Sequence, residues 1–318
     1  MFHVKQLPLL PFLCHFNLSA LKNNLSIKET ETIPAKAWLV LLGLALAWGT
    51  SYILIKKGLV AFSPVQLASL RIGITAFIFL PFILLQKKKI DWSKWKQLLV
   101  VGFLGSLLPA FLFATAQTRI SSSLSGVLSS LTPLFTLLLG IMFFNVQSTW
   151  TKVAGVLLGL LGAVWLLVVD RGLGDFEGMA FGLLVVVACF CYAVSSNVVK
   201  AYLQNMPTLA ISAVSYIMVG FPAVIFLFTT NFMETMQAHP AAWSSLGFIA
   251  ILAISSTVLG SLFFFKLIKD TNVVFASTVS YLIPVVAILW GVLDGESITF
   301  LHLIGMLVVL SGVYVARK

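Results

Sequence analysis

The feature that most restricts the fold of this chain is a series of ten apolar runs, separated by short polar segments. An α-helix rises 1.5 Å per residue, so about twenty apolar residues are needed to cross the hydrocarbon core of a bilayer. The runs lie at 37–57, 64–85, 97–117, 122–144, 153–170, 178–199, 208–230, 243–265, 272–293 and 299–316. Only 9% of the residues are charged, which is too few to cover a water-facing surface. The sequence therefore predicts an all-α integral membrane protein with ten transmembrane helices.

The basic residues gather in alternate connections between these runs. Lys87, Lys88 and Lys89 follow the second run, and further lysines precede the first and third runs. Connections rich in Lys and Arg stay in the cytoplasm, so we expect a multi-pass protein of the cell (inner) membrane with both termini cytoplasmic. The net charge of +10 is spread over these short connections, where it meets anionic lipid, and it forms no basic face for a nucleic acid.

The first 35 residues differ from the rest of the chain. Their apolar stretch, 7–16, is too short to span a bilayer and is interrupted by Pro8 and Pro11. We therefore predict a disordered cytoplasmic tail over 1–35. Two five-helix domains are expected to follow, over 36–170 and 171–318.

Landmarks in these two domains recur at a constant distance along the chain. Pro133 follows a Ser-Ser-Leu-Thr segment, and Pro284, 151 residues later, follows Ser-Tyr-Leu-Ile. Gly155 lies near the start of the fifth run and Gly305 near the start of the tenth, 150 residues apart. Five helices per copy is an odd number, so the second copy must enter the membrane inverted. Inverted repeats place a substrate site near the bilayer midplane, in a central cavity between the halves, and their rocking gives alternating access.

Arg71 is the sharpest candidate for function. It stands seven residues after Pro64, which places it about 10 Å below the outer end of its span. A charged side chain at that depth is costly and usually faces a cavity or a partner. Arg71 is therefore predicted either to bind a substrate carboxylate through two parallel hydrogen bonds or to clamp neighbouring helices.

Trp48 lies near the middle of the first run, where the preference of tryptophan for membrane interfaces does not explain it. It is predicted either to line the cavity, with Ser51 and Tyr52 beside it, or to pack between helices. A Trp ring in a cavity could stack on an apolar or cationic part of a substrate.

Polar stripes mark the fourth and ninth runs. Ser125 and Ser129 lie on one face of the fourth run, and Ser277 and Tyr281 form the counterpart in the ninth. Such a stripe either lines water or binds a neighbouring helix, and we expect both stripes to line the cavity. Pro133 and Pro284 are expected to kink these helices, because proline removes a helical hydrogen bond.

Small residues in the last run of each half favour close helix packing. The four glycines expected at such contacts are Gly155, Gly159, Gly305 and Gly312.

The residue types that are missing from the spans restrict the mechanism. Asp and Glu occur only in the tail, in connections and at the ends of spans, so no carboxylate is expected at mid-membrane to carry a proton or bind Na⁺. The three Cys and four His are scattered, and neither a metal site nor a cofactor is expected. No HExxH, GxSxG or phosphate-binding loop motif occurs, which argues against an enzyme. Transport would then proceed by exchange, by facilitated diffusion or by coupling through other groups.

The segment Trp48-Gly-Thr-Ser-Tyr52, with Lys56 one turn later, resembles the signature of EamA-type members of the drug/metabolite transporter superfamily. Arg71 is similar to that family's second-helix pattern, as are the Ser-Leu-Thr-Pro133 segment and the Gly-Glu296 pair at their positions. One position departs from the pattern, because Val146 stands where the first repeat usually carries a glutamate.

The resemblance implies an inner-membrane carrier that exports or exchanges amino acids or similar small metabolites. It implies a monomer or a homodimer joined by the last helix of each half. Two alternatives stay open: a channel-like facilitator of small solutes, and a carrier of another substrate class such as drugs or sugar derivatives.

Overall fold

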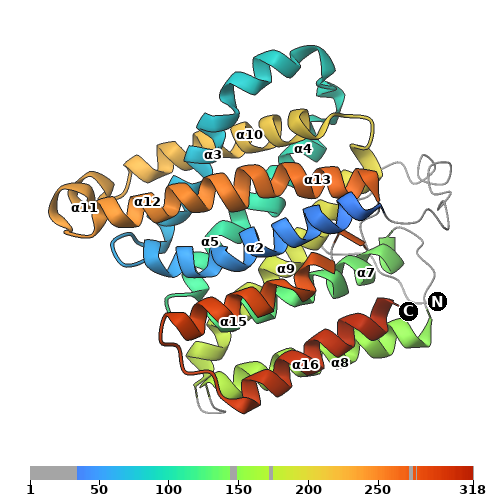
Figure 1. Ribbon diagram of the computed structural model, residues 1–318. Helices are drawn as coiled ribbons and strands as arrows, with labels where there is room; N and C mark the ends of the chain where they lie inside the picture. Colours follow the sequence, from blue (N-terminus) through green and yellow to red (C-terminus); the bar gives the residue numbers. More distant parts are fainter. Residues whose placement is uncertain (1–33, 144–148, 172–174, 272–274, 277, 318) are drawn as a thin grey trace, which may run out of the picture. The chain divides into compact units, whose positions relative to one another are not determined.

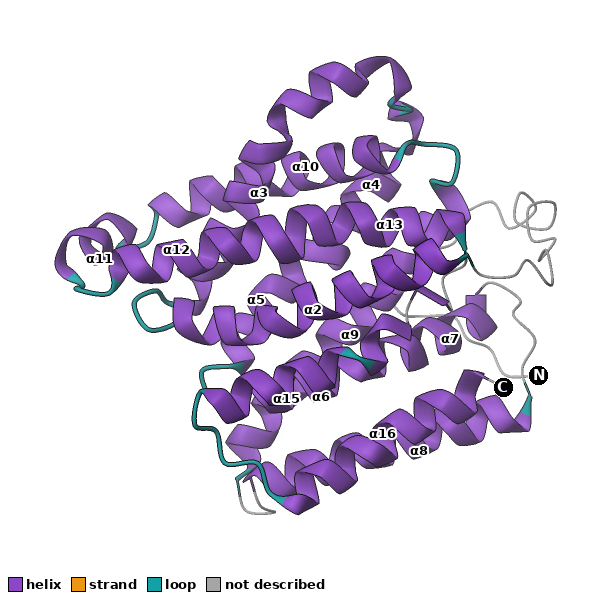
Figure 2. Cartoon of the chain, viewed as in Figure 1, coloured by secondary structure: helices purple, strands orange, loops and turns teal. Residues whose placement is uncertain are grey.

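The computed structural model describes residues 34–143, 149–171, 175–271, 275–276 and 278–317. Figure 2 shows these ranges as helices joined by loops, and no strand occurs within them. Nearly all of the predicted tail over 1–35 lies outside the described residues, as do Val146 and Ser277.

Eight helical segments are long and apolar enough to cross a membrane, and two shorter apolar ones follow them. The eight are α2 (Ala35–Gly58), α3 (Pro64–Gln86) with η2 (Lys87–Lys89), η3 (Trp92–Lys94) with α4 (Trp95–Gly102), η4 (Phe103–Leu107) and α5 (Leu108–Ala116), α6 (Ser122–Leu128) with η5 (Ser129–Leu131) and α7 (Thr132–Phe143), α8 (Trp150–Arg171), α9 (Phe176–Tyr202), α10 (Thr208–Phe228), and α12 (Ala242–Leu252) with η6 (Ala253–Leu259) and α13 (Gly260–Asp270). The two shorter ones are η7 (Thr278–Tyr281) with α15 (Ile283–Leu293), and α16 (Phe300–Arg317). Within the described residues, each predicted apolar run overlaps one of these segments. A short surface helix, α11 (Phe232–Ala238), lies between α10 and α12.

Local side chains explain where several of these helices begin. Ser63 and Gln66 form a capping box at the start of α3, and Pro64 occupies its first position, where a missing N–H costs nothing. Asp175 accepts a hydrogen bond from the Gly178 backbone N–H at 2.8 Å and so caps α9.

Four breaks in helical geometry fall at matching places in the chain. The π-helices η4 and η6 begin at Phe103 and Ala253, 150 residues apart. Such π segments insert one extra residue into a helical turn and often occur at functional sites. Pro133 and Pro284 are each the second residue of an α-helix; η5 directly precedes the first of these helices, and η7 precedes the second with only Leu282 between. The predicted kinks therefore coincide with a change of helix type.

Contacts between elements also recur in the two parts of the chain. The helix α2 packs against α12, α13 and α15, while α9 packs against α4, α5 and α7. The two most extensive pairings are α3 with α10 and α8 with α16, and the latter pair lies along one side of the bundle in Figure 1.

Glycines permit the close approach of α8 and α16. A Cβ added at Gly155 would lie 2.6 Å from the Ala316 Cα, and one at Gly312 would lie 2.6 Å from the Gly159 Cα. A Cβ at Gly305 would lie 2.7 Å from the Leu166 side chain. Gly159 is equally tight, since its added Cβ would overlap Leu134 of α7. All four glycines thus stand at contacts within one chain.

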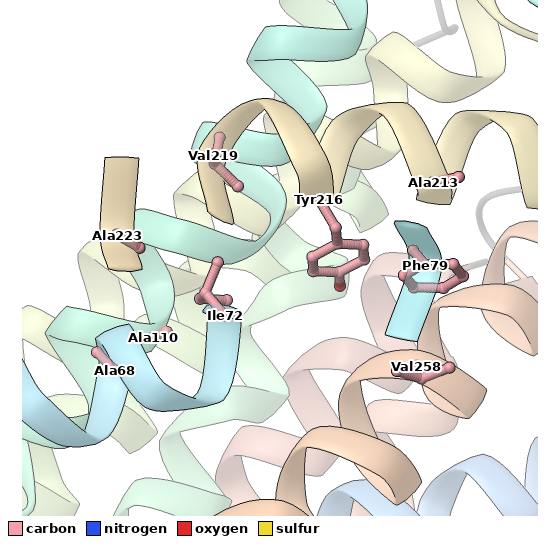
Figure 3. Close-up of a cluster of buried hydrophobic side chains, with 9 residues drawn as sticks. All are labelled: Ala68, Ile72, Phe79, Ala110, Ala213, Tyr216, Val219, Ala223 and Val258. Carbon is pink, nitrogen blue, oxygen red and sulfur yellow. The ribbon is translucent and has the colours of Figure 1, made fainter. Parts of the chain in front are cut away.

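A cluster of buried apolar side chains joins α3 and α10 to α5 and η6. Its nine residues are Ala68, Ile72, Phe79, Ala110, Ala213, Tyr216, Val219, Ala223 and Val258 (Figure 3). The rings of Phe79 and Tyr216 stack, with their centroids 5.5 Å apart. This cluster holds α3, which carries Arg71, against the second half of the chain.

Candidate central binding site

A cavity of about 120 Å³ lies between the helices of the two halves. Its volume suits a solute of roughly ten non-hydrogen atoms, since one water-sized sphere needs about 10–15 Å³. It is lined by Trp48, Ser51, Tyr52, Ile55, Arg71, Ile72, Gly105, Ser106, Phe113, Ser129, Thr132, Tyr192, Ser195, Ser196, Tyr216, Ser256, Thr257, Ser261, Phe264, Phe265, Val279, Ser280 and Ile283. Polar and aromatic side chains from α2, α3, α9, α10 and η6 therefore converge on one space.

Arg71 is the single charged residue in this lining. Its Nε–H donates to the Thr257 Oγ1 atom at 2.8 Å. In the described part of the chain its two terminal nitrogens, Nη1 and Nη2, have no acceptor within hydrogen-bond distance. A guanidinium with two parallel N–H groups free is suited to bind a carboxylate.

Trp48 lines the same cavity and is anchored to η6. Its Nε1–H donates to the Ser256 carbonyl at 2.8 Å, and the Ser256 hydroxyl donates to the Ala47 carbonyl at 2.7 Å. The edge of the indole contacts Gly260, where a Cβ would lie 2.6 Å from the Trp48 Nε1 atom. Glycine at position 260 is therefore required for this approach.

Most of the hydroxyl groups that line the cavity already donate a hydrogen bond to a backbone carbonyl. Ser51 donates to the Trp48 carbonyl, Ser129 to the Gly126 carbonyl and Ser196 to the Tyr192 carbonyl. Thr132, Ser256 and Ser261 likewise donate to backbone carbonyls. A hydroxyl whose proton is used in this way still offers its oxygen lone pairs. The cavity thus presents hydrogen-bond acceptors apart from the donors of Arg71.

Aromatic rings make up much of the remaining wall. Tyr192 and Phe113 stack with centroids 6.1 Å apart, and Tyr52 lies 5.6 Å from Phe113. Phe264 meets Trp48 edge to face at 5.0 Å. Such rings bind apolar groups and, through their faces, cations.

The structure brings five of the eight predicted binding residues to this cavity: Trp48, Ser51, Tyr52, Arg71 and Ser129. Two others lie elsewhere. Ser125 is fully buried and donates to the Ser121 carbonyl at 3.1 Å, so its hydroxyl serves its own helix. Tyr281 is not part of the lining, whereas its neighbour Ser280 is. Ser277, the eighth, is outside the described residues.

Sequence reasoning missed most of the contribution from the second half, above all Tyr192, Tyr216 and Thr257. One signal was available for Tyr192, which occupies in the second half the place that Trp48 occupies in the first, 144 residues earlier. Nothing distinguishes Thr257 in the sequence from the many other hydroxyl residues of the spans.

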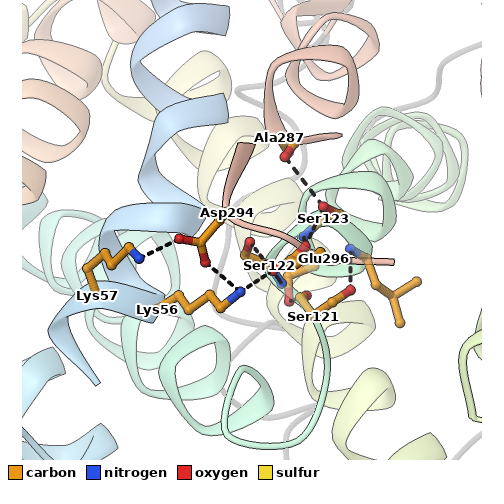
Figure 4. Close-up of polar contacts among 10 residues, drawn as sticks. Lys56, Lys57, Ser121, Ser122, Ser123, Ala287, Asp294 and Glu296 are labelled. Atoms are coloured by element: carbon orange, nitrogen blue, oxygen red, sulfur yellow. Dashed lines mark hydrogen bonds and ion pairs between the residues drawn. The ribbon is translucent and has the colours of Figure 1, made fainter. Parts of the chain in front are cut away.

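A network of charges joins the end of α2, the start of α6 and the loop after α15, and this region is here named the Glu296 end (Figure 4). Lys56 Nζ lies 2.7 Å from Asp294 Oδ2 and 2.8 Å from Glu296 Oε1, and Lys57 pairs with Asp294. Glu296 also accepts hydrogen bonds from the backbone N–H and the hydroxyl of both Ser122 and Ser123, at the start of α6. The network joins α2, α6 and the loop between α15 and α16.

The turn at Gly295 and the hydrogen bonds to the two carboxylates explain the geometry and the charge of this network. Gly295 has φ 79°, a left-handed conformation that glycine adopts without strain, and it turns the chain between the two acids. Burial alone would raise the pKa of Glu296, but hydrogen bonds from Lys56, Ser122 and Ser123 outweigh it and hold the pKa at about 2. Hydrogen bonds from Lys56 and Lys57 likewise lower the pKa of Asp294.

A second cavity, of about 340 Å³, opens beside this network. Its polar lining includes Lys56, Ser123, Asp170, Glu296 and His302. The His302 Nε2 and Asp170 Oδ1 atoms lie 3.6 Å apart. The described residues contain no cluster of His, Cys, Asp and Glu that could hold a metal ion.

A solved structure shares this arrangement of helices. It aligns with a TM-score of 0.61 and 19% sequence identity, covering 89% of this chain and 97% of the other. At that identity the likeness concerns the fold alone.

The model of the EamA-like transporter family matches this chain twice, over residues 35–168 and 180–317. The chain belongs to that family, and it is a multi-pass membrane transporter rather than an enzyme. The resemblance drawn from the first- and second-helix motifs is thereby confirmed. A transporter of this kind moves a small molecule and has membrane lipid around it.

Several named transporters are similar over most of their length. A transporter of Archaeoglobus fulgidus is 27% identical over 284 residues, covering 89% of this chain and 99% of the relative. A Salmonella typhimurium protein, named a "probable amino-acid metabolite efflux pump", is 25% identical over 84% of this chain and 90% of its own length. The inner membrane transporter YedA of Escherichia coli is 25% identical over 81% of this chain and 83% of its own.

Proposed function

We propose that this chain is an inner-membrane carrier that exports or exchanges amino acids or similar small metabolites by alternating access. The observation that carries the proposal is Arg71, which lines the central cavity and whose two terminal nitrogens have no acceptor in the described part of the chain. The names of the Salmonella and Escherichia relatives support the substrate class and the membrane.

The two kinds of hydrogen-bonding group in the cavity support an amino acid in particular. Arg71 offers donors to a carboxylate, while Ser51, Ser129 and Ser196 offer oxygen atoms whose protons are already used. An ammonium group has three N–H donors and no acceptor, so it complements such oxygens, and the aromatic wall adds cation–π attraction. No carboxylate is needed in the cavity for this mode of binding.

We also propose that the fold consists of two inverted five-helix repeats, 36–170 and 171–318. The two matches to one family model support a duplication. So do the π-helices at Phe103 and Ala253 and the prolines 133 and 284, which keep nearly the same offset. The recurring contacts, α2 with α12 and α13 and α9 with α4 and α5, are those expected of two halves related by a twofold axis.

The charge pattern supports an orientation in which both termini lie in the cytoplasm and the Glu296 end faces outward. Basic residues at an outer face break the positive-inside rule. At the Glu296 end, however, Lys56 and Lys57 pair with Asp294 and Glu296, and Arg119 lies 3.2 Å from Glu177. These cations each have an acidic partner, and they are outnumbered by the basic residues of the opposite connections, which include Lys87, Lys88, Lys89, Lys94 and Lys96.

Counterflow in proteoliposomes tests the carrier proposal. Proteoliposomes that contain the purified protein and are loaded with unlabelled L-leucine should accumulate labelled L-leucine from outside. The rate of uptake should saturate as the external concentration rises. Arg71→Lys should abolish most of this uptake, because an ammonium cannot form the two parallel bonds of a guanidinium. Arg119→Lys, at an exposed ion pair, is the matched control and should transport normally. Unsaturable flux would favour the channel-like alternative, and normal uptake by the Arg71 variant would contradict the carboxylate site.

A further inference from the structure

The hydroxyl of Thr257 is the only described group that fixes the guanidinium of Arg71. Thr257 is 3% exposed, and its Oγ1 atom accepts the hydrogen bond from Arg71 Nε–H at 2.8 Å. Its own proton is directed to the Leu252 carbonyl, five residues earlier, at 3.5 Å. The oxygen therefore acts toward Arg71 as an acceptor.

The π-helix η6 explains how Thr257 comes to this position. A threonine in a regular α-helix bonds to a carbonyl three or four residues earlier, whereas here the bond reaches back five residues, in the register of a π-helix. The adjacent residue, Ser256, receives the Trp48 indole on its carbonyl at 2.8 Å. Two consecutive residues of η6 thus hold one side chain from α3 and one from α2.

The choice of the Nε atom has a chemical consequence. A guanidinium can bind a carboxylate through two edges, one formed by Nε with one terminal nitrogen and one formed by the two terminal nitrogens. Thr257 occupies Nε, so the first edge is blocked. The second edge, with Nη1 and Nη2, has no acceptor among the described residues, and Arg71 lines the cavity.

We infer that Thr257 is a positioning residue for substrate recognition: its hydroxyl occupies Nε of Arg71 and so presents the two terminal nitrogens to a substrate carboxylate. The inference rests on the proposed function, because it concerns the same cavity. The competing explanation is that the Arg71–Thr257 bond only joins α3 to η6. The two explanations differ in what they predict for binding and for stability.

Three variants and a pair of ligands separate them. Thr257→Val removes the oxygen while keeping the branched shape, Thr257→Ser keeps the oxygen, and Thr136→Val is a control at a buried threonine outside the cavity. L-leucine carries the carboxylate, and L-leucinamide lacks it. Binding is measured on purified protein by thermal shift and titration, and transport by counterflow.

Wild type should bind L-leucine at least tenfold more tightly than L-leucinamide. Thr257→Val should weaken L-leucine binding about tenfold, reflecting the loss of one charge-assisted hydrogen bond, and should leave leucinamide binding unchanged. In counterflow its KM should rise by the same factor while the maximal rate stays within about twofold. Thr257→Ser should restore the wild-type KM, and Thr136→Val should retain it. Should the valine variant fail to fold, Thr257→Ala beside Thr257→Ser makes the same comparison.

The outcomes are distinguishable. If wild type does not discriminate L-leucine from its amide, the proposed carboxylate site fails, and the inference fails with it. If wild type discriminates but Thr257→Val binds both ligands as wild type does, the inference alone is overturned. A lower thermal midpoint or lower maximal rate with an unchanged KM would assign Thr257 to helix packing and overturn it as well.

Discussion

Glu296 is the residue on which most polar contacts of the Glu296 end converge. Its side chain is 8% exposed and accepts bonds from Lys56, Ser122 and Ser123. Glu296→Gln leaves the shape but removes the charge, so Lys56 loses one of its two carboxylates. We expect a loss of about 2 kcal/mol of stability, below the usual cost of breaking a buried pair because the Lys56 side chain is 37% exposed. Thermal unfolding in detergent measures it. Glu177→Gln, at an exposed pair with Arg119, should change little.

The same residue gives the protein a defined response to acid. The pKa of Glu296 falls from an ordinary value of 4.5 to about 2 in the folded chain. Its stabilisation is therefore complete above pH 4.5 and disappears as the pH falls from 4.5 toward 2. The thermal midpoint should drop over that range in wild type and drop less in Glu296→Gln. An identical decline in both proteins would show that Glu296 does not titrate as part of the network.

At this scale the sequence predicts charged and large residues better than small polar ones. Arg71 stands out because a guanidinium inside the bilayer is costly unless it faces a cavity or a partner. Trp48 stands out because tryptophan usually lies at the membrane interface and not at the centre of a span. Ser125 and Thr257 do not stand out. Whether a membrane-embedded hydroxyl serves its own helix, as Ser125 does, or a cavity, as Thr257 does, depends on a rotation of the helix that hydropathy does not report.

Among the elements, α8 and α16 offer the clearest test of packing. A Cβ added at Gly312 would lie 2.6 Å from the Gly159 Cα. The atom that it meets belongs to the backbone of α8, which cannot move aside as a flexible side chain can. Gly312→Leu should therefore lower stability by about 1–3 kcal/mol through overpacking. Gly43→Leu is the matched control, because no atom lies within 4 Å of an added Cβ at that position. Thermal midpoints of the two variants decide the matter, and equal midpoints would contradict tight packing of α8 on α16.

The sequence predicts the long elements well and the breaks within them poorly. Apolar length alone locates α2, α8 and α10, because a bilayer accepts little besides a helix of sufficient length. Proline marks the interruptions at the start of α7 and α15, because it lacks the N–H group that a helical hydrogen bond needs. The π-helices η4 and η6 carry no such residue, since an extra residue in a helical turn changes the register without changing the composition.

For the whole molecule, the proposed orientation predicts which surfaces an impermeant reagent can reach. Val60, at the Glu296 end, is 59% exposed, and Lys88 is exposed at the opposite end. In intact cells an impermeant maleimide should label Val60→Cys, and Lys88→Cys only after the membrane is opened. The background should be low, because Cys189 and Cys191 are buried and Cys14 can be replaced by serine. The reverse labelling pattern would invert the proposed topology.

Side-chain bonds between the two halves of the chain have a consequence for engineering. Arg71 with Thr257, in the wall of the cavity, and Lys56 with Glu296, at the Glu296 end, each link a side chain of the first family match to one of the second. A chimera that takes residues 180–317 from a relative would therefore keep one member of each pair and replace the other. To give this transporter the substrate preference of a relative, both residues of each pair must therefore be exchanged together.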